Sequence, residues 1–280
     1  MSPGSRTFAV IGDPVAHSAS PVLFAAVARE LGLTLDYRAV RVPAGELASF
    51  LGRVRDGAYQ GFSVTLPHKE AMLRLADSAT GAARAIGAAN TVAVLTGGRL
   101  EAHNTDAAGL VHALAEQGVT LAGASVVVLG AGGVARAAVY ACREQGARSL
   151  AIANRTRARA EALVQALGGR AVDLDRTSLR PVLDAADVLL QASSAGLSRP
   201  EETPLPAGCV LHRNLTVLDM VYQPLETALL RAARSAGART VDGLWMLVHQ
   251  GLEQLRFWTG VEAPASLAPR LHAELARGLR

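Results

Sequence analysis

The chain has 280 residues, half of them hydrophobic and 19% charged, which suffices for one large or two modest domains with adequate cores. The net charge is +4 and the pI about 9.6, but no basic run exceeds two residues and only 4% are aromatic, which argues against nucleic-acid binding. No apolar stretch reaches the ~18 residues of a membrane span, and Cys142 and Cys209 lie outside any Cys/His ligand spacing, so we expect a cytoplasmic protein without a metal site.

The basic residues are almost all arginine. Lys69 is the only lysine among 28 basic residues, which leaves 27 arginines. Arginine cannot give up a proton in a protein, whereas lysine can. The single lysine therefore invites a chemical explanation, although composition alone does not decide between that and chance.

The first hundred residues predict a mixed α/β unit. After the first strand, Ser20 is expected to cap a helix that has Pro21 at its first position. Two alternating segments, 91–95 and 99–103, flank a Thr-Gly-Gly turn and predict a β-hairpin. The predicted strands are 7–11, 35–40, 59–66, 91–95 and 99–103, with an amphipathic helix at 44–55.

Strands and helices alternate again in the second part of the chain, after a helix predicted over 107–117. Repeated βα units with short apolar strands favour a parallel, doubly wound sheet. Two α/β units joined by helices also predict a ligand cleft between them. The predicted strands are 125–129, 149–153, 187–191, 216–219 and 239–241, and the predicted helices are 133–145, 156–167, 225–235, 244–258 and 265–279.

A glycine-rich loop near the start of the second unit is typical of dinucleotide-binding proteins. It follows the apolar strand Val126–Leu129 and leads into a helix. Gly130 permits a tight turn, Gly132 lets the backbone approach a pyrophosphate, and Ala135 lets helix and strand pack closely. The alternative is a tight βα turn that binds nothing. The residues expected to bind a cofactor here are Gly130, Ala131, Gly132, Gly133, Val134 and Ala135.

Seven segments, in order and at compatible spacings, resemble motifs of the shikimate dehydrogenase family. Residues 12–21 are similar to its N-terminal substrate loop, and residues 61–70 to its catalytic lysine segment. The other segments are 87–92, 104–106, 154–156, 219–224 and 242–250, so the resemblance runs nearly from end to end.

The resemblance implies an α/β fold with two domains and a cleft between them. A mixed α/β substrate-binding and catalytic domain would comprise residues 1–106 and 243–280, and a Rossmann-like, doubly wound NADP-binding domain would comprise 107–242. The alternation of elements by itself indicates only the change near 106. The return of the C-terminal helices to the first domain is implied by the family alone.

The resemblance assigns Lys69 and Asp106 as the catalytic pair. Lys69 would hydrogen-bond the carbonyl oxygen of the substrate and donate a proton as hydride arrives at the carbon, and Asp106 would orient Lys69. The serines at 18 and 20 would bind a carboxylate, and Thr65, Asn90 and Gln250 would hold ring hydroxyls. The implied substrate-binding residues are Ser18, Ser20, Thr65, Lys69, Asn90, Asp106, Tyr222 and Gln250.

Several of these residues also have a purely structural interpretation. Lys69 could begin a solvated helix and Asp106 could cap one, although the motif match favours their catalytic roles. Ser20 could be only a helix cap, Asn90 could fill a turn, and Gln250 could lie on a solvated helix face. The histidines beside these motifs lack metal-ligand spacing and are interpreted as supporting or solvent residues; they are His17, His68 and His249.

The second strand of the nucleotide unit favours NADP. An NAD site usually has an acidic residue about 20 residues beyond the glycines, which binds the ribose 2′-OH. Residues 154–159 contain no carboxylate, whereas Arg155 and Arg159 can pair with a 2′-phosphate; the alternative is an ordinary basic helix start. By resemblance, Met220 would line the nicotinamide pocket, although it could equally be an apolar strand-end residue. The remaining expected cofactor-binding residues are Asn154, Thr156 and Gly243.

Three positions depart from the family pattern. Ser63 stands where the family often has asparagine, Ala107 where glycine commonly follows the aspartate, and Trp245 where a small residue is frequent. Because Ser63 and Trp245 are expected near the substrate pocket, the preference between shikimate and quinate stays open.

The resemblance implies an oxidoreductase that acts on a CH–OH group with NADP. It would reduce 3-dehydroshikimate reversibly to shikimate in the biosynthesis of chorismate and the aromatic amino acids. A paralogue acting on quinate or an amino-substituted analogue stays open, as does a catalytically silent NADP-binding regulatory protein, which the retention of Lys69 with Asp106 argues against. The expected partner is the small-molecule substrate, without nucleic acid or membrane, and a homodimer is left open.

Overall fold

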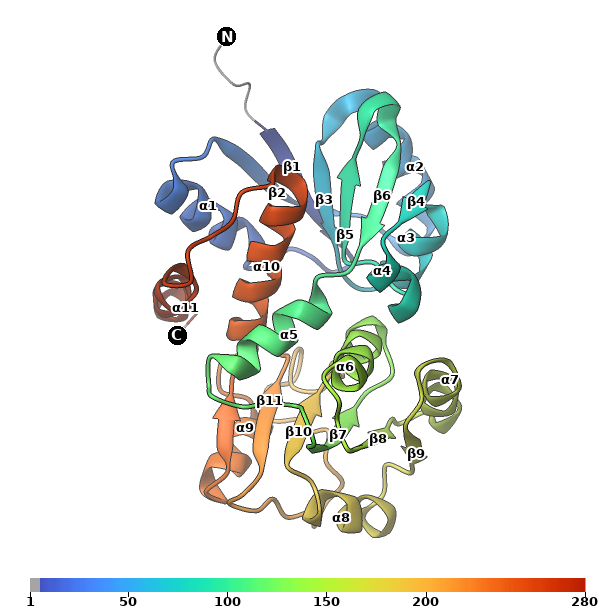
Figure 1. Ribbon diagram of the computed structural model, residues 1–280, viewed down its shortest axis with the longest axis vertical. Coiled ribbons are helices and arrows are strands. Elements are labelled where there is room, and N and C mark those ends of the chain that lie inside the picture. The colour runs from blue at the N-terminus through green and yellow to red at the C-terminus, as the bar shows by residue number, and fades with distance from the viewer. Residues whose placement is uncertain (1–5, 280) are drawn as a thin grey trace. The chain divides into compact units, whose positions relative to one another are not determined.

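The computed structural model describes residues 6–279, and the chain divides into two compact units. The first unit comprises the residues up to Thr105 together with Gln250–Leu275, and the second comprises Asp106–His249 together with the residues from Ala276 onward. Each unit has one six-stranded sheet (Figure 1). The predicted α/β class is confirmed. Among the helices of residues 6–279, none is long and apolar enough to cross a membrane.

The sheet of the first unit is mixed. Its strands are β1 (Arg6–Gly12), β2 (Leu35–Arg41), β3 (Gly61–Val64), β4 (Ser78–Ala79), β5 (Thr91–Val94) and β6 (Leu100–His103). They lie in the order β2-β1-β3-β5-β6-β4; β5 is antiparallel to both of its neighbours, and all other pairs are parallel. The predicted hairpin is confirmed as β5 and β6, with Val94 opposite Leu100. The two-residue strand β4 was not predicted, because so short a strand has no periodicity.

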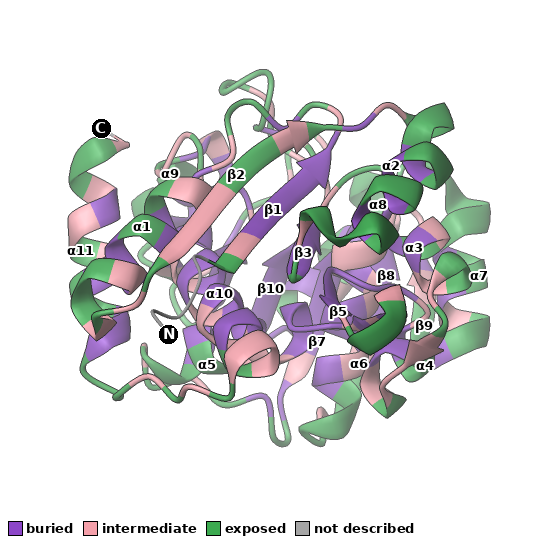
Figure 2. Cartoon of the chain, turned by 90° about the horizontal axis from the view of Figure 1, so that it is seen from above, coloured by how far each residue is buried: buried purple, intermediate pink, exposed green. Residues whose placement is uncertain are grey.

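The core of the first unit lies around the middle strands of this sheet. The last five residues of β1 are buried, whereas β2 at the sheet edge has no buried residue (Figure 2). Phe50 and Phe62 pack edge to face with ring centroids 5.4 Å apart, and Ile11 and Met72 belong to the same cluster. Burial of these side chains is the main favourable term in folding this unit.

Among the described residues, six α-helices contribute to the first unit, and one of them, α10, begins in the second. They are α1 (Ser20–Leu31), α2 (Leu47–Arg53), α3 (Lys69–Leu75), α4 (Gly81–Ile86), α10 (Gly243–Thr259) and α11 (Leu267–Gly278). A Cβ atom at Gly251 of α10 would lie 2.6 Å from Cδ2 of Leu23 in α1. The absence of a side chain at position 251 therefore leaves the space that Leu23 occupies, and the two helices pack closely there.

Two local predictions in the first unit are wrong. Ser20 is not a helix cap but the first residue of α1, and Ala19 occupies the cap position without a side-chain hydrogen bond. The side chain of Ser18 instead accepts the N–H of Ser20 at 3.3 Å. The helix predicted over 44–55 consists of a short 3₁₀ turn, α2 and a π-helical segment that ends where Gly57 adopts φ 93°.

The sheet of the second unit is entirely parallel. Its strands are β7 (Ser125–Leu129), β8 (Ser149–Ala153), β9 (Arg170–Val172), β10 (Val188–Gln191), β11 (Thr216–Asp219) and β12 (Arg239–Val241). Their order is β12-β11-β10-β7-β8-β9, so the chain reverses its direction of travel across the sheet between β7 and β10. Sheets of this order bind ligands beyond the carboxyl ends of the strands at the reversal point.

The predicted helices of the second unit are present within a few residues of their predicted bounds. Its helices are α5 (Asp106–Ala115), α6 (Gly133–Glu144), α7 (Arg157–Leu167), α8 (Arg176–Asp184) and α9 (Ala228–Ser235). Helix α8 and strand β9 were not predicted. Helix α8 contains Pro181, and a proline inside a segment argues against a helix in the sequence. Its start is nevertheless capped in the ordinary way, because Asp175 accepts the N–H of Ser178 at 2.9 Å.

Candidate active site

Polar residues of the first unit gather at one edge of its sheet. β1, β3 and β6 end at this edge and β5 begins there, because β5 alone runs in the opposite direction. The segments after β1, β3 and β6 and before β5 therefore meet. These segments and the helix starts that follow them contain the predicted residues Ser18, Ser20, Thr65, Lys69 and Asn90.

A glycine lets the segments after β1 and β3 approach each other. A Cβ atom at Gly12 would lie 2.9 Å from the carbonyl oxygen of Leu66, which is closer than real Cβ contacts. The N–H of Asp13 donates to that same oxygen at 2.9 Å. The loop that contains Ser18 is thereby attached to the segment that begins with Thr65, and both of these side chains are half-buried.

Lys69 is the first residue of α3 and is only 8% exposed, so its interpretation as a solvated helix start is wrong. Its carbonyl oxygen accepts the N–H of Ala89 at 2.9 Å, which ties α3 to the segment before β5. The preceding residue, His68, is also buried, and its Nε2 donates to the carbonyl oxygen of Val42 at 2.6 Å. Hydrogen bonds thus hold both Lys69 and the residue before it in place.

The other two histidines beside the motifs lie elsewhere. His17 is exposed in the loop after β1. His249 is half-buried in the second unit, where its Nε2 lies 3.4 Å from a carboxylate oxygen of Glu116 and its ring contacts those of His112 and Trp245.

Asn90 joins three segments of the polar edge and is 2% exposed, so it does more than fill a turn. Its main chain accepts the N–H of Val64 at 2.7 Å and donates to the carbonyl oxygen of His103 at 3.1 Å. Its Oδ1 accepts the N–H of Thr105 and the hydroxyl of Thr91, both at 2.8 Å. Its Nδ2 donates to Oγ1 of Thr105 at 3.0 Å.

Gln250 belongs to the same buried network, so its placement on a solvated helix face is wrong. Its Oε1 lies 3.4 Å from Nδ2 of Asn90 and accepts from Nε2 of Gln254 at 2.8 Å. Ser63 donates to Oε1 of Gln254 at 2.8 Å and lies 2.7 Å from the hydroxyl of Tyr37. Sequence reasoning missed Gln254 and Tyr37. The four-residue spacing of Gln254 from Gln250 could have indicated that they share a helix face.

Asp106 is buried and is the first residue of α5, not the residue that precedes the helix. Before it, Nδ2 of Asn104 donates to the carbonyl oxygen of Ala88 at 2.9 Å, which fixes the end of the first unit. Lys69 belongs to the first unit and Asp106 to the second, so the catalytic pairing of these two residues stays a prediction.

In the second unit, the glycine-rich loop lies at the reversal point of the sheet. Gly130 has φ 120°, and a Cβ atom there would lie 2.8 Å from the carbonyl carbon of Ala192, so only glycine fits without strain. Gly132 has an ordinary φ of −91°, and a Cβ atom there would meet nothing within 4 Å. Ala135 is fully buried. Gly130 is thus required by the fold, whereas Gly132 borders open space at the start of α6.

Three arginines near the start of α7 differ in their partners. Arg157 pairs with Glu161 at 2.8 Å and with Asp173, and these bonds raise its pKa. Within residues 6–279, Arg155 and Arg159 are exposed and form no ion pair with an acidic side chain. The turn before the helix is closed by Asn154, whose Nδ2 donates to the carbonyl oxygen of Thr156 at 2.9 Å.

Asp219 organises the segment after β11. This carboxylate is fully buried; it accepts the N–H of Val221 at 3.0 Å and the hydroxyl of Thr227 at 2.7 Å. Burial disfavours its charged form and raises its pKa to about 6. A Cβ atom at Gly243 would lie 2.7 Å from the carbonyl carbon of Met220, so these two predicted cofactor residues lie together. Tyr222, just beyond, is half-buried.

The residues at this edge of the second sheet suit a dinucleotide with a phosphorylated ribose. The start of α6 presents main-chain N–H groups, and the open side of Gly132 leaves room for a pyrophosphate. Arg155 and Arg159 supply positive charge that no carboxylate among the described residues pairs with. These two arginines would hold a 2′-phosphate.

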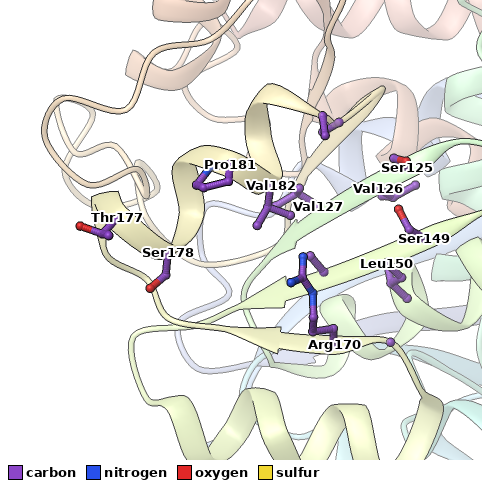
Figure 3. Close-up of a pocket in the computed structure, with 14 residues that line it drawn as sticks. Ser125, Val126, Val127, Ser149, Leu150, Arg170, Thr177, Ser178, Pro181 and Val182 are labelled. Atoms are coloured by element: carbon purple, nitrogen blue, oxygen red, sulfur yellow. The ribbon is translucent and has the colours of Figure 1, made fainter.

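A separate hollow of about 520 Å³ lies in the second unit between α8 and the amino ends of β7, β8 and β9 (Figure 3). Pro181 and Val182 line it from α8, and Ser149 and Arg170 line it from the sheet. It contains none of the predicted site residues and lies at the opposite ends of the strands from Gly130. In the described part of the chain, no three His, Cys, Asp or Glu side chains are grouped to hold a metal ion.

Three family models match the chain. A model described as "Shikimate dehydrogenase substrate binding domain" matches residues 10–92, and one described as "Shikimate / quinate 5-dehydrogenase" matches residues 113–203. A third, "Shikimate 5'-dehydrogenase C-terminal domain", matches residues 243–267. Together they cover more than half of the 280 residues.

Curated relatives and solved structures agree with these matches. A protein of Thermococcus kodakarensis named "Shikimate dehydrogenase (NADP(+))" is 41% identical, over 94% of each chain. A Halobacterium salinarum protein of the same name is 42% identical, over 96% of this chain and 99% of its own. The crystal structure of Thermus thermophilus shikimate 5-dehydrogenase in complex with NADP(H) and shikimate superposes with a TM-score of 0.87 at 40% identity, covering 98% of this chain and all of that one.

The buried carboxyl of Asp219 predicts a specific pH dependence of stability. Its pKa of about 6 lies above the ~3.9 of an unfolded aspartate, so the protonated form favours folding. The stabilisation from the protonated carboxyl is fully present below about pH 4 and is lost as the pH rises through about 6. The free energy of unfolding of wild type should fall by about 3 kcal/mol over this range. Asp219→Asn cannot ionise at this position and should escape that loss.

Denaturant unfolding of wild type and Asp219→Asn at pH 4, 5, 6 and 7 checks this prediction. The unfolding free energy of the variant should gain on that of wild type as the pH rises, whatever constant offset the substitution introduces. Parallel pH profiles for the two proteins would show that Asp219 has the same pKa in the folded state as in the unfolded chain.

Proposed function

Because the chain belongs to the shikimate dehydrogenase family, we propose that it reduces 3-dehydroshikimate reversibly to shikimate with NADPH, as in chorismate and aromatic amino-acid biosynthesis. The observation that supports this most directly is the polar edge of the first sheet. There the only lysine of the chain is buried among segments that also carry Asn90 and lead to Gln250.

In this proposal, Lys69 exchanges the proton. Negative charge grows on the carbonyl oxygen as the carbon accepts hydride, and the protonated amine of Lys69 donates a hydrogen bond and then a proton to that oxygen, which leaves the amine neutral. In the reverse direction the neutral amine removes the hydroxyl proton. Asp106 would orient the amine of Lys69 and accept from a hydroxyl of the substrate.

Small polar side chains would hold the ring of the substrate. Ser18 and Ser20 would donate to its carboxylate, since the loop after β1 lies beside the segment with Thr65. The hydroxyl-binding residues would be Thr65, Asn90, Tyr222 and Gln250. Many short donors and acceptors suit a polyhydroxylated acid, whose hydroxyl groups need one partner each when they are taken out of water.

Bound NADPH supplies the hydride. The loop from Gly130 to Ala135 would bind its pyrophosphate at the start of α6, and Asn154, Arg155, Thr156 and Arg159 would hold the 2′-phosphate end. Met220 and Gly243, which lie together, would border the nicotinamide.

The domain roles follow from these assignments. Residues 1–106 with 243–280 would form the substrate domain, and 107–242 the NADP-binding domain, with the reaction in a cleft between them. The two free cysteines, Cys142 and Cys209, support a cytoplasmic location, and we propose no nucleic-acid partner. A measurement of molecular mass in solution decides between a monomer and a homodimer.

The substrate assignment is tested by comparing 3-dehydroshikimate with 3-dehydroquinate in one NADPH-oxidation assay. The dehydroshikimate should give the higher kcat/KM, since the ring-binding groups are short and the quinate ring carries an additional hydroxyl. Equal or faster turnover of 3-dehydroquinate would instead make the chain a quinate-type enzyme.

Two substitutions of Lys69 separate proton transfer from charge. Lys69→Ala should lower kcat by about 100-fold or more, because general acid–base groups contribute roughly 10²- to 10⁴-fold, while substrate binding is retained. Lys69→Arg keeps a cationic donor that cannot release its proton and should be nearly as slow. Steady-state kinetics with binding titrations measure both effects. Near-wild-type turnover of Lys69→Arg would remove Lys69 from the proton-transfer step.

Arg155→Asp should change the preference between cofactors. The KM for NADPH should rise by roughly 10- to 100-fold, as expected for the loss of a charge-assisted hydrogen bond, and the KM for NADH should change little. Arg157→Ala is the matched control, because Arg157 is already paired with Glu161 and Asp173. If Arg155→Asp weakened both cofactors equally, its role would be structural.

A further inference from the structure

A continuous chain of hydrogen bonds runs from the half-buried Tyr37 through buried polar side chains of the first unit to Gln250. Tyr37 contacts Ser63 at 2.7 Å, and Ser63 donates to Gln254 at 2.8 Å. Gln254 donates to Gln250 at 2.8 Å, and Nδ2 of Asn90 approaches the same oxygen of Gln250 at 3.4 Å. The amide of Gln250 is therefore contacted from two sides by other amides.

The direction of hydrogen bonding at the Asn90 end is set by the main chain. The N–H of Thr105 can only donate, and it lies 2.8 Å from Oδ1 of Asn90. The oxygen of this amide must therefore face Thr105, and its Nδ2 must face Oγ1 of Thr105 and Oε1 of Gln250. Reversing the Asn90 amide would place two N–H groups against each other in a buried site, which costs the full desolvation of a donor.

The direction at the Gln254 end is set in the same way. The main-chain carbonyl oxygen of Asn90 can only accept a hydrogen bond, and Nε2 of Gln254 lies 3.5 Å from this oxygen. Its Oε1 accepts the single hydroxyl proton of Ser63, so Tyr37 is the donor in its bond with Ser63. Nε2 of Gln254 thus faces Oε1 of Gln250.

The two ends together determine which atom of Gln250 can donate. Its Oε1 accepts from Asn90 on one side and from Gln254 on the other, so Nε2 is the donor of this side chain. We propose that Gln254, held by Ser63, is a positioning residue that fixes the amide of Gln250 with Nε2 toward an oxygen of the substrate. The role of Gln250 as a substrate ligand is part of the proposed function, on which this inference rests.

Ser63 and Gln254 act as a pair in this arrangement. The hydroxyl of Ser63 is short, and the longer amide of Gln254 connects it to Gln250. Without the donor at 254, only the longer contact with Nδ2 of Asn90 at 3.4 Å holds Oε1 of Gln250, so its amide rotates more readily. Once the amide has turned, the substrate oxygen loses the hydrogen bond that Nε2 donates. The serine at a position where the family often has asparagine is thus accompanied by a glutamine one helical turn after Gln250.

Two substitutions at 254 test the proposal. Gln254→Met keeps the length of the side chain and removes the amide. Gln254→Glu keeps an acceptor for Ser63 but replaces the donor Nε2 with oxygen, so it draws Nε2 of Gln250 toward itself. Each should raise the KM for 3-dehydroshikimate by roughly 3- to 10-fold, as for one lost hydrogen bond, and leave the KM for NADPH unchanged.

A double-variant cycle distinguishes positioning from a general loss of structure. Gln254→Met should add less than about twofold to the KM of Gln250→Ala, because without the Gln250 amide there is nothing left to orient. If the KM of the double variant rose by the product of the two single-variant increases, the proposal would be overturned. Glu253→Gln is the matched control on the same helix, since Glu253 pairs with Arg256, and its kinetic constants should equal those of wild type.

Each outcome has a separate meaning. If Gln250→Ala leaves the KM for 3-dehydroshikimate unchanged, the proposed substrate role of Gln250 is wrong. If Gln250→Ala raises that KM but Gln254→Met and Gln254→Glu do not, only the positioning role is wrong. Should Gln254→Met fail to fold, Gln254→Glu combined with Gln250→Ala makes the same non-additive prediction.

Discussion

The amide of Asn90 is buried, and a buried amide needs hydrogen-bond partners other than bulk water. This requirement governs the polar edge of the first sheet. Asn90 accepts from the main chain after β6 through Oδ1 and from the end of β3 through its carbonyl oxygen. Its Nδ2 approaches Gln250 on α10, a residue 160 positions away in the chain. Three separate parts of the sequence are therefore bonded to one residue within this unit, two of them through its side chain and one through its main chain.

Much of the fold could be predicted because it follows from local patterns. The parallel strands of the second unit are short apolar runs that alternate with helices, and the hairpin of β5 and β6 flanks a glycine turn. Local patterns failed where they were short or misleading. β9 has three residues, α8 contains Pro181, and the serine expected to cap α1 lies one residue inside it.

The candidate site could be predicted where a residue belongs to a recognisable motif, as Lys69 and Asn90 do. The burial of Lys69, however, depends on packing that composition does not reveal. Gln254 escaped notice because its partner Ser63 is 191 residues away. The arginines at 155, 157 and 159 look alike in sequence. The structure shows that Arg157 pairs with Glu161 and Asp173, whereas the other two form no ion pair with an acidic side chain of residues 6–279.

The missing side chain at Gly251 separates two properties of its neighbour Gln250. Close packing of α10 against Leu23 of α1 determines where the main chain at 250 lies. Hydrogen bonds from Asn90 and Gln254 determine which way its amide points. The position of Gln250 thus depends on apolar residues, and the direction of its amide depends on polar ones. The position and the direction can therefore change independently during evolution. A new pattern of donors for a different ring can arise by exchanging polar residues, while the helix pair that stabilises the unit stays as it is.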